Sequence, residues 1–263
     1  MKFAVAVDCE GPACVVGKPG GTLTDSPNFE FAKRQATREA DAAARGLFAA
    51  GATQVLVYDY HGDGVNLNYD LLDKRVDIAV GSGTAHRLPG LDDSFAGLLL
   101  VGYHAMDNTP DAVICHTFNS VAFQWMKVNG QEVGEMAIDA AVAGERGVPV
   151  ILVSSDDKGV AEAQRFFPGI ESVTTKTAYG YNSAISMHPA RAVDAIFAAA
   201  QCAGHRAAQK GAFKPYMFPS PLTLEVHYKR IEGAESASRR GQGWERVDAY
   251  TVRRTMRTIS EYF

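Results

Sequence analysis

Several features that would point to common protein classes are absent from this chain of 263 residues. It has no Cys-x-x-Cys pair, and four cysteines at this length do not make a disulfide framework. No apolar run approaches the roughly 18–20 residues that a membrane span requires. Asp8 and Glu10 interrupt the first apolar run before a signal-peptide core could form. We therefore expect a protein of the reduced cytoplasm without a membrane partner.

The chain also lacks the sequence features of nucleic-acid-binding proteins, of nucleotide-binding proteins and of serine hydrolases. A net charge of −4 and a pI near 6.0 argue against nucleic-acid binding, and Arg239-Arg240 and Arg253-Arg254 are isolated pairs. The sequence has no Walker lysine-serine pair, and the absence of a Gly-x-Ser-x-Gly elbow argues against a serine hydrolase. The apolar fraction of 46% is ordinary for a globular protein. The length allows one large domain or two modest ones.

Continuous apolar runs predict the strands of a parallel sheet that is covered on both faces. These runs are Lys2–Val7, Gln54–Tyr58, Asp77–Val80, Leu98–Val101 and Pro149–Val153. Helices are predicted over Phe31–Ala50, Gly134–Gly144 and Asp156–Phe167, with Asp156 or Asp157 as the N-cap of the last. Strand–helix alternation indicates right-handed crossovers. We predict an α/β fold with a doubly wound, mostly parallel sheet, and a catalytic domain over residues 1–188.

The rest of the chain follows a different pattern. Ser120–Val128 and Gln131–Val133 flank Asn129-Gly130, a strong signal for a β-hairpin. Beyond residue 188 we predict a smaller α+β domain over residues 189–263. Its expected elements are a helix over Pro189–Gln209, a strand over Leu222–Tyr228, a helix over Glu232–Arg239, a strand over Arg246–Val252 and a last helix to Phe263.

Five side chains able to bind a metal stand where a strand should end or a helix should begin. They are Asp8, Glu10, His61, His104 and Glu135. In an open α/β sheet, ligands bind in the crevice beyond the carboxyl ends of the strands. Each residue alone has an ordinary alternative as a cap, a turn residue or a surface histidine. Three strand ends that each deliver a carboxylate or an imidazole to one edge nevertheless predict a metal site.

The chemistry of this set favours zinc. Asp8 and Glu10 project from one face of an extended chain, so their carboxylates repel each other unless a cation lies between them. A carboxylate can bridge two ions roughly 3.5–4 Å apart, and zinc lowers the pKa of its bound water from ~15.7 to about 7. A nitrogen and oxygen set without thiolates favours zinc, with manganese and cobalt as alternatives. His116 is the natural proton carrier, and Asp59 either orients an imidazole or closes a turn.

Six segments together resemble a known family. They are Val7-Asp8-Cys9-Glu10-Gly11, Asp59-Tyr60-His61-Gly62, Gly102-Tyr103-His104-Ala105, His116-Thr117, Asn129-Gly130 through Gly134-Glu135, and Ser154-Ser155-Asp156-Asp157. Their order and spacing are similar to those of the zinc D-aminopeptidases of peptidase family M55, most strongly up to about Lys176. The resemblance implies two zinc ions per subunit. It makes Asp8 the bridging carboxylate and Glu10, His61, His104 and Glu135 the other ligands, with His116 as a further catalytic residue. It also implies a ring-like homodecamer.

Three departures from the family pattern bear on the substrate. Tyr60 stands where a serine is common, His86-Arg87 lies in a segment where methionine is common, and Ser154-Ser155 precedes the paired aspartates. None of them removes an expected ligand. We therefore expect a dizinc aminopeptidase that releases an N-terminal residue, typically D-alanine, from short peptides. The alternatives are a metal amidohydrolase for a non-peptide amide and a metal- or peptide-sensing module without turnover.

Overall fold

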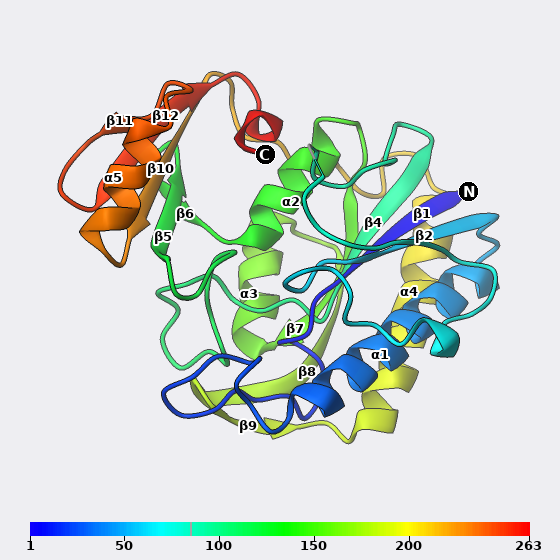
Figure 1. Ribbon diagram of the computed structural model, residues 1–263. Helices are drawn as coiled ribbons and strands as arrows, with labels where there is room; N and C mark the ends of the chain where they lie inside the picture. Colours follow the sequence, from blue (N-terminus) through cyan, green and yellow to red (C-terminus); the bar gives the residue numbers. More distant parts are fainter. Residues whose placement is uncertain (85) are drawn as a thin grey trace.

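The computed structural model describes residues 1–84 and 86–263, and the described chain forms two β-sheets (Figure 1). The larger sheet has seven strands in the order β3-β2-β1-β4-β7-β8-β9. Its strands are β1 (Lys2–Val7), β2 (Gln54–Asp59), β3 (Asp77–Ala79), β4 (Phe95–Val101), β7 (Val150–Asp156), β8 (Glu171–Gly180) and β9 (Ser183–Ser186). All neighbours pair in parallel except β8 and β9. The predicted doubly wound α/β sheet is confirmed.

Helices cover both faces of this sheet. On one face lie α1 (Phe29–Ala49) and α4 (Pro189–Ala207), and on the other lie α2 (Glu135–Gly144) and α3 (Asp157–Phe166) (Figure 1). Alternate residues of β1 enter the two cores, because Phe3 and Val5 pack with α1 while Ala4 and Ala6 pack with α2. A central strand buried on both sides has no polar face. For that reason it reads as an uninterrupted apolar run in the sequence.

The smaller sheet is antiparallel and has the strand order β11-β12-β10-β5-β6. Its strands are β5 (Phe123–Val128), β6 (Gln131–Val133), β10 (Leu222–Tyr228), β11 (Glu245–Arg246) and β12 (Thr251–Met256), and α5 (Ile231–Arg239) packs beside them. Asn129 and Gly130 both have positive φ, 52° and 81°, as a type I′ hairpin turn requires. The predicted β5–β6 hairpin is therefore confirmed.

The two sheets do not follow the expected boundary between residues 188 and 189. Helix α4 lies after that boundary, yet its Ile196 and Ala200 pack in the same core as α1 on the larger sheet. Strands β5 and β6 lie before the boundary, yet β5 pairs with β10 in the smaller sheet. The chain therefore crosses between the two sheets more than once, and the division into two domains stays a prediction.

Some elements differ from the sequence-based expectations. The expected strand over Arg246–Val252 is split, because the Asp248 carboxylate accepts hydrogen bonds from the backbone N–H groups of Tyr250 and Thr251 and closes a turn there. The last helix is a short 3-10 helix, Ile259–Tyr262. The hairpin of β8 and β9 was not anticipated. As expected, Asp156 caps α3 by accepting a hydrogen bond from Gly159 N. Among the described residues, no helix combines the length and the apolar character needed to cross a membrane.

Candidate metal centre

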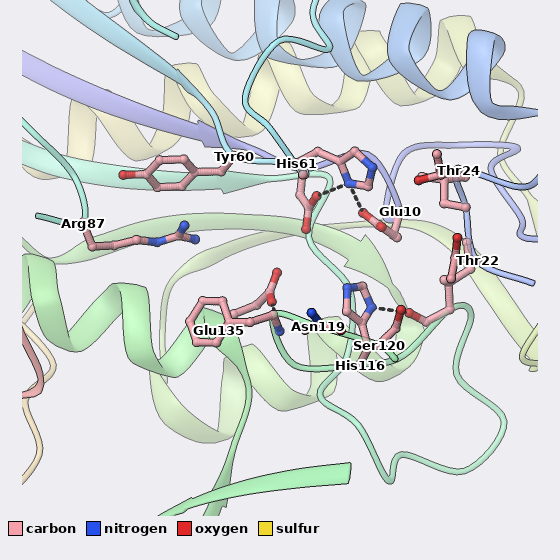
Figure 2. Close-up of a pocket in the computed structure, with 15 residues that line it drawn as sticks. Glu10, Thr22, Thr24, Tyr60, His61, Arg87, His116, Asn119, Ser120 and Glu135 are labelled. Carbon is pink, nitrogen blue, oxygen red and sulfur yellow. Dashed lines mark hydrogen bonds and ion pairs between the residues drawn. The ribbon is translucent and has the colours of Figure 1, made fainter. Parts of the chain in front are cut away.

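The predicted ligands meet at the point where the strand order of the larger sheet reverses. Strand β1 has β2 on one side and β4 on the other, so the crossovers leave it in opposite directions. Asp8 and Glu10 follow β1, His61 follows β2, His104 follows β4, and Glu135 begins α2. Such a switch point is the standard ligand site of open α/β sheets. Figure 2 shows His61, Glu10, His116 and Glu135 around one pocket.

A tight junction between the ends of β1 and β4 sets the spacing of these side chains. Asp8 N donates to Val101 O at 2.9 Å, and Gly11 N donates to Gly102 O at 2.7 Å. A Cβ atom on Gly11 would lie 2.0 Å from the carbonyl oxygen of Tyr103. Because no side chain fits there, glycine at position 11 is what allows the two strand ends to approach each other.

Asp8 lies between two imidazoles and contacts each with a different carboxylate oxygen. His61 Nδ1 is 3.1 Å from Asp8 Oδ1 and 3.1 Å from Glu10 Oε2. His104 Nε2 is 3.3 Å from Asp8 Oδ2 and 3.0 Å from Glu135 Oε1. All five side chains predicted from the sequence are thus brought together. The arrangement has two halves that share Asp8, one centred on His61 and the other on His104.

His116 joins the half that contains His104. The two rings stack with their centroids 3.9 Å apart and their planes 11° from parallel. His104 Nδ1 lies 2.9 Å from Ala105 O and His116 Nδ1 lies 2.8 Å from Ile114 O. Because a carbonyl oxygen only accepts, both Nδ1 atoms carry the hydrogen, and in the neutral rings Nε2 has a free lone pair. Donor atoms of His104, His116 and Glu135 lie within 4.8 Å of one another, so His116 is placed for proton transfer or for metal binding.

The electrostatics of the cluster fit a cation. Burial alone would raise the pKa of Asp8, but hydrogen bonds from His104 and His61 hold that pKa well below its usual value. Burial alone would lower the pKa of His61, but the carboxylates of Glu10 and Asp8 raise it to about 11. The pKa of His104 is likewise raised, against the effect of burial, by Glu135 and Asp8. The carboxylates thus draw positive charge onto the imidazoles. A divalent cation would supply that charge instead and free the imidazole nitrogens for coordination.

Lys176 supports the loop that carries Glu10 and was not recognised in the sequence. Its buried ammonium group donates to the carbonyl oxygens of Glu10, Pro12 and Val15 at 2.5, 2.9 and 2.9 Å. A buried lysine is costly unless its donors are satisfied, and here three carbonyls satisfy all of them. The only sequence signal is a lysine within the run of β-branched residues that forms β8.

Of the two roles expected for Asp59, the structure shows that it closes a turn and does not orient an imidazole directly. Its carboxylate accepts hydrogen bonds from Asn66 Nδ2 at 2.9 Å and from Leu67 N at 2.8 Å. The same Asn66 amide donates to the carbonyl oxygen of His61. Asp59 therefore holds the loop after β2, and its effect on His61 passes through the backbone.

The cluster opens into a cavity of about 350 Å³. Five residues of the cluster line this cavity, namely Asp8, Glu10, His61, His116 and Glu135, whereas His104 is buried and does not line it. The lining also carries an aromatic and cationic set, of which the sequence analysis noted Tyr60 and Arg87 as departures from the family pattern that bear on the substrate. This set consists of Tyr60, Arg87 and Phe118.

Comparisons with known proteins identify the family of this chain. The family model described as peptidase M55, D-aminopeptidase, matches residues 1–263. A D-aminopeptidase of Bacillus subtilis (strain 168) is 31% identical over 249 residues, which are 90% of this chain and 85% of that relative.

A solved structure gives the same result. It is described as the Zn-dependent D-aminopeptidase DppA from Bacillus subtilis, a self-compartmentalizing protease. It matches with a TM-score of 0.89 at 29% identity, covering 100% of this chain and 94% of that chain. The resemblance inferred from the sequence motifs is confirmed. This chain therefore belongs to peptidase family M55, the D-aminopeptidases, and is a hydrolase.

Proposed function

We propose that this protein is a dizinc aminopeptidase that releases an N-terminal D-amino acid, such as D-alanine, from short peptides. Membership of the D-aminopeptidase family and the zinc dependence named for the DppA relative support this function. The single observation that carries it is the shared position of Asp8. Its two carboxylate oxygens face the imidazoles of His61 and His104, and Asp8 and His61 line a cavity of about 350 Å³.

The proposed ligands divide according to these contacts. Glu10 and His61 would hold one zinc ion, His104 and Glu135 the other, and Asp8 both. When bound, zinc supplies a Lewis acid for the peptide carbonyl and lowers the pKa of water. The hydrogen bond between His104 Nδ1 and Ala105 O supports this assignment, because metal-binding histidines usually donate their second ring N–H to such a partner.

His116 is proposed to move the proton. Because Ile114 O engages its Nδ1, Nε2 is the ring atom free to exchange a proton in the pocket. This atom can take a proton from the attacking water and return it to the departing amine. The stack against His104 fixes the plane of the ring, so that the lone pair of Nε2 keeps one direction.

The assembly and the setting are proposed by analogy. The DppA relative is described as self-compartmentalizing, which supports a homo-oligomer, and the family resemblance favours a ring of ten subunits. Light scattering coupled to size exclusion would then give about ten times the subunit mass of 28.3 kDa. A cytoplasmic location remains part of the same proposal.

The function is tested with zinc-reconstituted protein. D-Ala-D-Ala should be cleaved faster than L-Ala-L-Ala, and chelation should abolish cleavage until zinc is restored. Turnover of non-peptide amides alone would favour the amidohydrolase alternative. Tight peptide binding without any hydrolysis would favour the sensing module.

The role of His116 needs its own variant. His116→Ala should lower kcat by about 10²–10⁴-fold while elemental analysis still finds two zinc ions per subunit. Full activity in this variant would refute the proton-transfer role. Loss of one zinc ion would instead make His116 a ligand.

A further inference from the structure

Arg87 gives the pocket a positively charged side chain that is not a histidine. Among the described residues that line the cavity it is the only lysine or arginine. The centre of its guanidinium group lies 3.8 Å from the Tyr60 ring centroid and 5.4 Å from that of Phe118. Figure 2 shows the Arg87 side chain beside Tyr60, directed toward the side chains of the proposed metal ligands. Arg87 is therefore part of the substrate pocket as well as of the fold.

Both ends of Arg87 are held in place. Nε and Nη2 donate to the two oxygens of Asp139 at 2.7 and 2.9 Å, and this buried carboxylate also accepts from the Tyr103 hydroxyl at 2.7 Å. Arg146 Nη2 donates to the main-chain oxygen of Arg87 at 2.9 Å. Little conformational entropy remains to be lost when such a group binds a ligand.

Part of the guanidinium group is left for a ligand. Arginine has five N–H donors, and the pair with Asp139 uses two of them. Within the described part of the chain, Nη1 donates to no protein acceptor. The forked donor geometry of a guanidinium group matches a carboxylate better than any other common substrate group.

The position of Arg87 relative to the proposed metal ligands limits where the carboxylate of a bound substrate would lie. Asp139, which holds Arg87, is four residues after the proposed ligand Glu135 on α2. The side chains of Asp139 and Glu135 therefore lie on the same face of the helix, about 6 Å apart along its axis. In a dipeptide, three covalent bonds of about 1.3–1.5 Å separate the scissile carbonyl carbon from the carboxylate carbon. With hydrogen bonds of about 2.9 Å between Arg87 and its oxygens, a carboxylate one residue beyond the scissile bond is within reach of Arg87 when the scissile carbonyl lies beside Glu135.

We propose that Arg87 binds the carboxylate of the substrate and makes the enzyme selective for dipeptides with a free C-terminus. In the proposed complex, the peptide bond of the dipeptide lies beside the proposed metal ligands, and its C-terminal carboxylate reaches Arg87. This assignment rests on the proposed aminopeptidase function and adds a specificity residue to it. A longer peptide places an uncharged amide against the same fork and loses the interaction.

The test compares D-Ala-D-Ala with its C-terminal amide. In the native zinc-loaded enzyme, kcat/KM for the free acid should exceed that for the amide by about 10- to 100-fold, as expected for a charge-assisted hydrogen bond in a partly buried site. In Arg87→Met the two values should fall within about threefold of each other, mainly through a higher KM for the acid. Arg87→Lys keeps the charge without the fork and should show an intermediate preference.

A matched control and two contrary outcomes complete this test. Arg75 also pairs through Nε and Nη2 with one carboxylate, that of Asp73, but lies at the surface, so Arg75→Met should keep the full preference. A native enzyme without any preference for the acid would overturn the proposal. An Arg87→Met variant that slows the acid and the amide equally would show a structural role only.

The source of the carboxylate is tested with D-Ala-D-Glu that is amidated at its C-terminus. This peptide carries its carboxylate only on a side chain, and the native enzyme should treat it like D-Ala-D-Ala amide. Faster cleavage that disappears in Arg87→Met would assign Arg87 to a side-chain carboxylate and overturn the C-terminal assignment.

A binding measurement separates this proposal from the aminopeptidase function. Zinc-loaded His116→Ala protein should bind D-Ala-D-Ala at least tenfold more tightly than the amide by calorimetry, and the additional change Arg87→Met should remove that difference. If the native protein cleaves no peptide, the proposed function fails, yet the calorimetry still decides the role of Arg87. Equal affinities for acid and amide would overturn that role. Zinc content and circular dichroism show whether each variant is folded.

Discussion

The ammonium group of Lys176 lies 2.5 Å from the main-chain carbonyl oxygen of Glu10, beneath the loop that carries the proposed ligands. Lys176 comes from β8, at the far side of β7 from β4, so its side chain reaches across the end of the sheet. Two further carbonyls, of Pro12 and Val15, complete its hydrogen bonds. The geometry at Glu10 therefore depends on a residue 166 positions later in the chain.

Replacing Lys176 by methionine should damage both stability and metal binding. The change leaves three buried carbonyl oxygens without a hydrogen-bond donor, so we expect the free energy of unfolding to fall by roughly 2–4 kcal/mol. Glu10 should also lose its fixed position, so zinc should be lost to a competing chelator more readily. Urea unfolding and chelator competition measure the two effects. The control Lys158→Met removes a partly exposed lysine that pairs with Asp157, and both properties should stay native. Native zinc affinity in Lys176→Met would contradict the supporting role.

Glu39 should make stability depend on pH. Burial raises the pKa of its carboxyl group to about 7, against hydrogen bonds from Ala13 N and Gln35 Nε2 that favour the charged form. Because the folded-state pKa lies above the unfolded value near 4.5, this group's contribution to stability is complete below that value. It is lost as the pH rises through about 7.

Glu39→Gln should therefore be more stable than the native protein at pH 8 by about 1–3 kcal/mol, with little difference at pH 4.5. Denaturant unfolding between pH 4.5 and 8 measures this difference. Glu30→Gln, at an exposed carboxylate of the same helix α1, should leave the pH profile unchanged. An identical profile for Glu39→Gln would show that Glu39 does not titrate in this range.

Removal of zinc should lower the melting temperature. A ligand that binds only the folded state stabilises it by about 3–4 kcal/mol at 100 to 1,000 times its dissociation constant. In a chain of this size that corresponds to a shift of roughly 5–15 °C. Calorimetry with and without a chelator measures it. Asp8→Asn, which lacks the shared carboxylate, should bind fewer than two ions and respond less to the chelator. A native protein that melts at the same temperature in both conditions would argue against a metal site.

Gly11→Ala should separate the ends of β1 and β4. Its Cβ would lie 2.0 Å from Tyr103 O and 2.5 Å from the carbonyl carbon of Gly102, so the backbone must move. We expect a loss of about 2–4 kcal/mol in unfolding free energy and at least a tenfold loss of activity. Gly20→Ala is the control, because Gly20 has φ +75° but open space around it and should cost only about 1 kcal/mol. Native activity in Gly11→Ala would show that the junction tolerates movement.

The elements that the sequence predicted well are those with one dominant signal. Strands such as β1 appear as continuous apolar runs because both faces are buried, and the β5–β6 turn is marked by Asn129-Gly130. The missed strand β8 has a weaker signal. Its buried residues Val173 and Thr175 alternate with less buried ones, but Lys176 interrupts the pattern. A lysine that ends up buried against carbonyls cannot be told from a surface lysine by sequence alone.

The candidate site shows the same division. The meeting of Asp8, His61 and His104 could be predicted because parallel strands present their carboxyl ends at one edge of the sheet. Arg87 could be predicted only in part. The sequence marked His86-Arg87 as a departure from the family pattern that bears on the substrate, but it did not show the pair with Asp139, which is 52 residues away. Only the packing of α2 against the loop that carries Arg87 brings the pair to the pocket.

The interleaving of the two sheets has a consequence for the order in which the protein forms during synthesis. All five proposed ligands have been synthesised once Glu135 is added to the chain, but α1 still lacks α4 and β5 still lacks β10. The faces of α1 and β5 that become buried in the folded protein stay exposed until α4 and β10 have been synthesised. Metal loading should therefore be one of the last events in the maturation of each subunit, after nearly the whole polypeptide has been translated.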